Sequence, residues 1–216
     1  MSNDQPAAVT GAPKSGKRRA RVDHAERRAA ILRTGAALFV ERGLRGGTMD
    51  EIALRMGISK VVIYREFASK DALVAAIFED VLEALGALKN EPWSGYAGGT
   101  IGTIAAARQQ PDAFLLLYRD CRSDPLYRHH FERLQALYVD WLMGYFEHER
   151  GTGSHRALRA EMAVLNLTGF LFEALANWLT TGTPEEDTIF ASWIGDMIRD
   201  WRWNTEQKWQ IPRRRA

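Results

Sequence analysis

Apolar residues recur at helical spacing through most of the chain. Ile31, Leu32, Leu38 and Phe39 fall on one stripe, and this pattern predicts a first helix that ends at Gly43 with a left-handed cap. Strand-like alternation of apolar and polar residues is absent over any useful length. The sequence therefore predicts an all-α fold.

A second, shorter helix is predicted from its start signal. Residues 48–51 read Thr-Met-Asp-Glu, which is typical of a capping box. In this arrangement the Thr48 hydroxyl accepts from the backbone N–H of Glu51, while the Glu51 carboxylate accepts from that of Thr48. We expect this helix to stop at Gly57, because glycine readily adopts the left-handed conformation that ends helices.

Two more helices follow without a long loop. Ser59 is expected to cap a third helix over residues 60–67, in which Ile63 and Phe67 lie one turn apart on the buried side. Ser69 is expected to cap a fourth helix. Its apolar positions recur at intervals of four: Leu73, Ile77, Val81 and Leu85.

The rest of the chain predicts a larger helical bundle. A loop rich in Pro and Gly follows Gly86, and further helices are expected over about 98–110, 112–122, 125–149, 154–181 and 185–203. The expected domains are a small three-helix domain over 23–68 and a larger helical domain over 69–203. A disordered basic arm is expected over 1–22 and a basic tail over 204–216.

The turn at Gly57 gives the second and third helices the layout of a helix-turn-helix. In this motif the second helix of the pair enters the major groove of DNA. Lys or Arg can bond to guanine there, and apolar groups can contact the methyl group of thymine. The third helix offers such a mixture beyond Ser59, in Lys60, Val61, Val62, Tyr64 and Arg65.

Charge is divided unevenly along the chain. From Lys14 to Lys70 there are fourteen Lys and Arg against six Asp and Glu, whereas the remainder has fifteen against 21. A basic first third suits double-stranded DNA as its partner. The basic cluster of the arm either extends along a nucleic-acid backbone or into a minor groove, or is a solvated tail; its members are Lys17, Arg18, Arg19 and Arg21.

The stretch from Ile31 to Leu73 resembles the DNA-binding domain of the TetR family of transcriptional regulators. The resemblance is carried by the runs ILRTGAALFVERG and TMDEIALRMGISKVVIYREFASKDAL, which cover about a fifth of the chain. It implies phosphate contacts at Thr48, Tyr64 and Lys70. It also implies that the residues facing the groove are Lys60, Val61, Val62 and Arg65.

Two residues depart from the pattern of that family. Gly35 stands where Ala is usual and should cost the first helix up to about 1 kcal/mol, unless a neighbour packs closely against it. Glu66 stands where His is common. Its carboxylate either accepts from a cytosine amine, or faces solvent, or forms an intramolecular ion pair.

The larger domain is expected to form a homodimer. All seven tryptophans lie after residue 90. The apolar stripes of the helices expected at 154–181 and 185–203 are wider than a monomer normally buries. A four-helix interface between two copies would cover them, and the family resemblance implies the same dimer, with two reading heads about one DNA turn apart.

A small-molecule effector site is also expected in this domain. The resemblance implies such an effector, and the aromatic content suggests a lipophilic one. The large side chains that would line its cavity are Trp93, Phe114, Leu117, Tyr118, Trp141, Phe146 and Phe170. The polar side chains that would orient it are Arg119, Asn166, Glu173 and Asn177. Core packing or an interhelical hydrogen bond is the alternative role for each of them.

Several functions are disfavoured by what the sequence lacks. Cys121 is the single cysteine, so neither an internal disulfide nor a cysteine-based zinc site is expected. There is no run of eighteen apolar residues and no apolar N-terminal stretch, which predicts a cytoplasmic protein without membrane contact. His-Glu-x-x-His, a phosphate-binding Gly loop and a nucleophile elbow are absent, so no enzyme, metal or cofactor is expected.

These observations predict a sequence-specific DNA-binding transcriptional regulator. We expect a repressor that leaves a palindromic operator when a small lipophilic effector binds. One alternative is a dimeric DNA-binding protein without an effector. The other is an enzyme that uses some of the histidines: His129, His130, His148 and His155.

Overall fold

The computed structural model describes residues 14–146 and 154–208, and all regular structure within them is helical. The helices are α1 (Lys14–Gly46), α2 (Met49–Met56), α3 (Lys60–Glu66), α4 (Lys70–Ala87), α5 (Gly95–Gln109), α6 (Pro111–Leu115), α7 (Cys121–Ser123), α8 (Arg128–Phe146), α9 (Ser154–Thr181) and α10 (Asp187–Lys208). A π-helical turn, Leu116–Asp120, joins α6 to α7. Short 3-10 turns lie at Leu88–Asn90 and Pro184–Glu186. The predicted all-α fold is confirmed.

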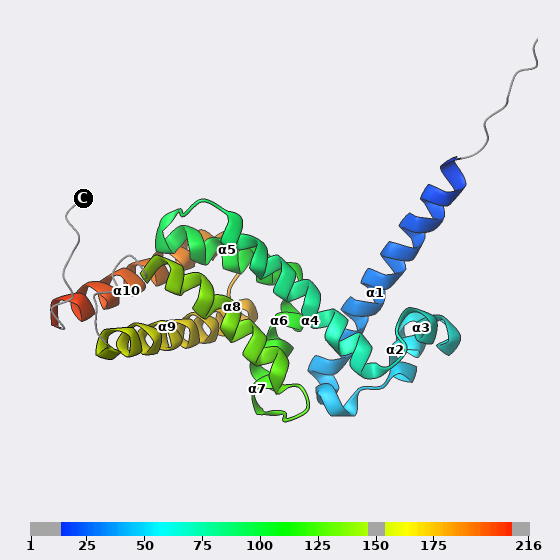
Figure 1. The fold of residues 1–216 in the computed structure, drawn as a ribbon. Helices are drawn as coiled ribbons and strands as arrows, with labels where there is room; N and C mark the ends of the chain where they lie inside the picture. The colour runs from blue at the N-terminus through cyan, green and yellow to red at the C-terminus, as the bar shows by residue number, and fades with distance from the viewer. Residues whose placement is uncertain (1–13, 147–153, 209–216) are drawn as a thin grey trace, which may run out of the picture.

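The N-terminal domain, or head, consists of α1, α2 and α3 and lies to the right in Figure 1. The N-terminal end of α1 projects away from the rest of the molecule (Figure 1). The interior of the head is filled by apolar side chains. These are Ile31, Leu38, Phe39, Ile52, Ile63 and Phe67, all buried.

The larger domain, or body, consists of α5 to α10, and α4 connects it to the head (Figure 1). The predicted stripe of α4 is buried along its whole length, at Leu73, Ile77, Val81 and Leu85. Helix α8 packs along α9, and α10 packs along α5. Because α4 connects the head to the body, a change in its tilt would move the head relative to the body.

Both ends of the described chain are more helical than expected. Helix α1 starts at Lys14, so the disordered arm predicted over 1–22 is wrong for residues 14–22. The reason is that this stretch has no proline and is rich in Lys and Arg, which favour a helix. Helix α10 continues to Lys208, so 204–208 are not part of a tail. Residues 1–13 and 209–216 lie outside the described residues.

Other boundaries differ from the predictions for local reasons. Gly43 has the expected positive φ of 74°, but its ψ of 157° makes it a kink, after which α1 resumes until Gly46. Helix α8 starts at Arg128 and not at Pro125, because the Asp124 carboxylate accepts from the backbone N–H of Leu126 at 2.9 Å and holds a turn. Helix α5 starts at Gly95, within the expected loop.

Candidate nucleic-acid interface and ligand-binding body

The helix-turn-helix is built from the local signals that the sequence contains. The Thr48 hydroxyl accepts from the backbone N–H of Glu51 at 3.2 Å, and the Glu51 carboxylate accepts from that of Thr48 at 3.0 Å. Gly57 ends α2 in the left-handed conformation, with φ 63° and ψ 29°. The predicted capping box and left-handed turn are therefore both present.

Helix α3 presents a mixed polar and apolar surface above two buried anchors. Ile63 and Phe67 are buried, as predicted. On the opposite side Val61 is 76% exposed and Tyr64 is 50% exposed. We call the exposed set the reading face; it consists of Lys60, Val61, Tyr64 and Arg65. Ser59 and Val62 flank it, Ser59 exposed at the N-cap but without a side-chain capping bond, and Val62 half-buried.

The two cations of the reading face differ in their surroundings. Lys60 forms an ion pair with Asp50 at the start of α2. Arg65 is exposed and makes no ion pair with any residue of the described ranges. Arg65 therefore can bond to a base edge without first breaking a contact of that kind.

Lys70, the expected phosphate contact at the start of α4, has a structural role within the head. Its ammonium donates to the backbone carbonyl of Arg45 at 3.0 Å and lies 5.4 Å from the centre of the Phe39 ring. Burial lowers the pKa of Lys70. A phosphate would have to share this ammonium with the end of α1.

Both residues that depart from the family pattern are explained by packing. An added Cβ at Gly35 would lie 3.3 Å from Cδ1 of Ile77, so the neighbours are close enough to account for a glycine. The Glu66 side chain is only 4% exposed, and its Oε2 lies 2.9 Å from Nε2 of His24. Of the three roles expected for Glu66, the structure contains the intramolecular contact.

The head is joined to the body by polar contacts that sequence reasoning missed. Arg45 donates to both carboxylate oxygens of Asp124, at 2.8 and 2.9 Å, and these hydrogen bonds hold the pKa of Asp124 at about 2. The Tyr127 hydroxyl donates to Asp71 at the start of α4 at 2.9 Å. Beside these contacts lies a cleft of about 510 Å³, lined by residues 42–46, Arg119, Asp120, Ser123, Asp124 and Pro125.

The residues expected to form one effector cavity lie in separate places. Phe114, Leu117 and Tyr118 are buried in the body core, where Phe114 and Tyr118 pack against Phe172. Half-buried Trp141 packs edge-on against Tyr138 in the same core. Trp93 is exposed before α5. Asn166 and Phe170 line a shallow groove of about 200 Å³ with Leu167, Met197, Ile198 and Trp201.

A single cavity was predicted because apolar spacing marks core and cavity residues alike. Several members of the set bond to one another: the Tyr118 hydroxyl donates to Glu173 at 3.0 Å, and Arg119 donates to Asn177 at 3.0 Å. Burial and the contact with Glu173 raise the pKa of Tyr118 to about 12. These pairs tie the π-helical turn to α9. The Phe146 side chain lies outside what the structure describes.

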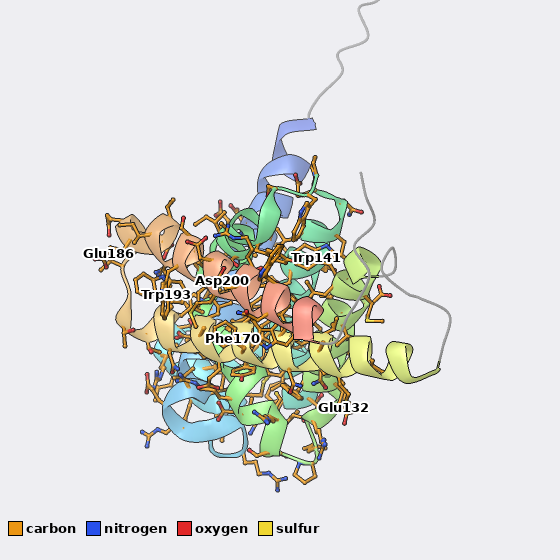
Figure 2. The ribbon with its side chains drawn as sticks, turned by 90° about the vertical axis from the view of Figure 1, so that its left-hand side faces the viewer. Glu132, Trp141, Phe170, Glu186, Trp193 and Asp200 are labelled. Carbon is orange, nitrogen blue, oxygen red and sulfur yellow. The ribbon has the colours of Figure 1, made fainter. Side chains whose placement is uncertain are left out.

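Helices α9 and α10 expose a large apolar surface. Figure 2 looks onto it, with Phe170 on α9 and Trp193 on α10. Ile189 is 71% exposed and Trp193 is 57% exposed. We call this surface the apolar face; it consists of Met162, Phe170, Ile189, Trp193, Met197 and Trp201, all exposed.

Part of α9 also has the length and composition of a membrane-crossing helix. This part is Glu161–Thr181, which meets the requirement by length and composition only. The core helix of a protein outside membranes meets the same criteria, and the contacts from Glu173 and Asn177 to the π-helical turn are typical of such a helix.

The described part of the chain contains no cluster of three His, Cys, Asp or Glu side chains able to hold a metal ion. His130 is buried against the Phe78 ring, and burial lowers the pKa of His130 to about 4. Burial raises the pKa of Cys121 to about 12, which makes its thiol unreactive. The side chains of His148 and His155 lie outside the described residues.

Comparison with known sequences shows that the head is similar to the DNA-binding domains of known transcriptional regulators. Residues 31–77 match the profile described as "Bacterial regulatory proteins, tetR family". Over 68 residues the chain is 43% identical to the HTH-type transcriptional activator FasR of Mycolicibacterium smegmatis, covering 31% of each chain. Over 59 residues it is 41% identical to the HTH-type transcriptional repressor KstR2 of Mycobacterium tuberculosis, covering 27% of this chain and 30% of KstR2. The chain thus matches about a third of the length of these relatives.

Comparison with solved structures extends the likeness to the body. The ketosteroid transcriptional regulator KstR2 of M. tuberculosis superimposes with a TM-score of 0.58 at 20% identity, over 80% of this chain and 92% of that one. FadR of Bacillus subtilis in complex with stearoyl-CoA superimposes with a TM-score of 0.58 at 12% identity, over 79% and 96%. At these identities the likeness establishes a shared fold.

Proposed function

We propose that the chain is a member of the TetR family of helix-turn-helix transcriptional regulators and a sequence-specific DNA-binding regulator, because residues 31–77 match the profile of that family and the head is similar to its curated members. In this proposal it acts in the cytoplasm as a homodimer that represses transcription. A small lipophilic effector releases it from a palindromic operator.

The observation that carries DNA binding is the reading face of α3. Its side chains are exposed while Ile63 and Phe67 beneath them are buried, so the helix is fixed and its outer surface is available. Arg65 and Lys60 suit guanine edges or phosphates, and Val61 suits a thymine methyl group. A short helix that is held in place and exposed in this way matches the geometry of a recognition helix.

The observation that supports a homodimer is the apolar face of α9 and α10. Exposed apolar patches of this kind on one side of a soluble protein typically mark an interface. A two-fold axis through the apolar face would pair the face of one copy with the same face of the other, and both faces would be buried. The two α3 helices would then be available to read two half-sites.

A lipophilic effector is supported by the aromatic core of the body and by the names of its relatives. KstR2 is named a ketosteroid regulator, and FadR was solved with stearoyl-CoA. The segment from Pro111 to Ser123 would transmit the signal in our proposal. Its π-helical turn contacts α9 through Tyr118, and just beyond its end Asp124 bonds to Arg45 of the head. Turns of this type are frequent at functional sites.

Selection of bound duplexes from a random DNA library tests the DNA-binding proposal. We expect enrichment of a two-fold symmetric site whose half-sites lie about 34–36 Å apart, one turn of DNA. No enrichment over the starting library in low-salt buffer would overturn it.

Titration with stearoyl-CoA separates the effector proposal from its main alternative, a dimer without an effector. Binding should quench tryptophan fluorescence and weaken operator binding about 5- to 150-fold, the usual range for coupled sites. Free coenzyme A is the control. If stearoyl-CoA, stearate and a ketosteroid all leave both signals unchanged, the alternative is favoured.

A further inference from the structure

The end of the recognition helix is held by two residues of α1. His24 Nε2 lies 2.9 Å from Glu66 Oε2, and the Arg28 guanidinium lies 4.5 Å from the centre of the Phe67 ring. His24 and Arg28 are one helical turn apart, and Glu66 and Phe67 are consecutive. We propose that Glu66 is a positioning residue, which sets the orientation of α3 on the DNA through its contact with His24.

Helix α3 needs such a support because it is short. It has seven residues, its N-cap Ser59 makes no side-chain capping bond, and Phe67 at its end is in an extended conformation. Isolated helices of this length are unstable in water, so tertiary contacts decide where the helix lies. Ile63 and Phe67 fix one side of it. The contact between Glu66 and His24 fixes its rotation at the C-terminal end.

The surroundings of Glu66 make this contact sensitive to loss of its partner. The carboxylate is almost fully covered, and its Oε1 has no hydrogen-bond partner among the described residues. A buried carboxylate oxygen without a partner is unfavourable, so His24 is the main polar group that stabilises this position. Without His24 the carboxylate would move toward water and take the end of α3 with it.

The expected consequence is a change in sequence preference. Arg65 directly precedes Glu66, so a rotation of α3 displaces the cation that is free to bond to a base. Phosphate contacts made elsewhere in the head would be unaffected. Loss of the His24–Glu66 contact should therefore reduce the preference for the operator over other duplexes, while the salt dependence of binding stays the same.

This inference rests on the proposed function, and a double-mutant cycle on the full-length protein tests it. His24→Ala, Glu66→Ala and the double variant are measured by fluorescence anisotropy on the selected operator and on a scrambled duplex of equal length. Each single variant should lower the ratio of the two affinities about tenfold, and the double variant should lower it no further. His129→Ala, which changes an exposed histidine of the body, is the control.

A reciprocal exchange separates positioning from a general loss of structure. The variant with both His24→Glu and Glu66→His keeps the two groups facing each other and should recover most of the lost preference, with unchanged melting temperature. Full additivity of the two single effects, or no effect of either, would overturn the inference. If the wild-type protein itself did not distinguish the two duplexes, the proposed function would fail first.

Discussion

The reading face of α3 and the apolar face of α9 and α10 expose similar side chains in different settings. Val61 on α3 and Ile189 on α10 are exposed to a similar degree. On α3 the exposed apolar side chains lie between the cations Lys60 and Arg65, whereas on α10 they form one stripe. DNA offers methyl groups between phosphates, while a second copy of the chain offers a continuous apolar surface. The neighbours of an exposed apolar residue, more than its exposure, thus indicate its partner.

The largest effect is expected from a charge in the centre of the apolar face. Trp193→Glu should convert the dimer to a monomer and weaken operator binding about 100-fold or more, because the two heads are no longer linked. Light scattering after size exclusion measures the mass. Leu126→Glu, at an exposed residue away from this face, should remain dimeric. A dimeric Trp193→Glu would show that the apolar face is not the interface.

The next largest effect concerns the polar contact that holds α10 in place. The Asp187 carboxylate accepts from Arg108 at 2.6 Å through both oxygens and from Trp178 Nε1 at 2.7 Å. Asp187→Asn should lower the free energy of unfolding by about 2–3 kcal/mol at pH 7, measured with urea. Asp196→Asn, which removes an exposed pair with Arg199, should cost about 0–1 kcal/mol.

The effect of Asp187→Asn should depend on pH. Burial raises the pKa of Asp187, but the hydrogen bonds from Arg108 and Trp178 and the charge of Arg108 outweigh it, so the pKa lies below its ordinary value. The stabilisation is therefore complete above about pH 4, the unfolded-state pKa of Asp, and is lost as the pH falls through the lower folded-state value. The difference in free energy of unfolding between wild type and Asp187→Asn should therefore stay constant above about pH 4 and narrow as the pH falls below it. A difference that stays the same below pH 4 would contradict this account.

A smaller effect is expected from Arg65→Ala on the reading face. The variant should relax the preference at one base pair of each half-site by about 1–3 kcal/mol and leave the other positions unchanged. Competition with single-substituted duplexes measures this. Arg128→Ala, which removes an exposed cation of α8, is the control. Equal weakening on every duplex would identify Arg65 as a phosphate contact.

The smallest effect is expected from Lys70→Ala. It should weaken binding to all sequences alike and reduce the dependence of log affinity on log salt by about one unit. Because Lys70 also bonds to the Arg45 carbonyl, a slight loss of stability of the head should accompany this change. Lys89→Ala, in the 3-10 turn after α4 and outside the head, should leave the salt dependence unchanged. An unchanged slope for Lys70→Ala would limit Lys70 to its structural role.

The head was largely predictable because its signals are local in the sequence. Thr48 and Glu51 are three residues apart, and Ile63 and Phe67 are four residues apart. Each pair lies within about one turn of helix, so its spacing in the sequence is enough to predict its role. Gly57 likewise determines the turn by its own conformational preference.

The rest of the site depends on contacts between distant residues, which a helical pattern does not encode. Arg45 and Asp124 are 79 residues apart, and nothing in the spacing of charges paired them. Tyr118 was expected to line a cavity, yet apolar periodicity marks only that it faces inward. Comparison with the family pattern marked Glu66 as unusual. Its partner His24 could not be predicted, because the contact depends on how α1 packs against α3.

The central claim is that the reading face of α3 recognises base sequence, and a direct measurement is the ratio of affinities for the selected operator and a scrambled duplex. The account predicts a ratio of about 1,000 or more for the wild-type protein at physiological salt. It also predicts that a triple variant with alanine at Val61, Tyr64 and Arg65 lowers this ratio to near one without loss of helicity. A wild-type ratio near one, or a triple variant that keeps the wild-type preference, would contradict it.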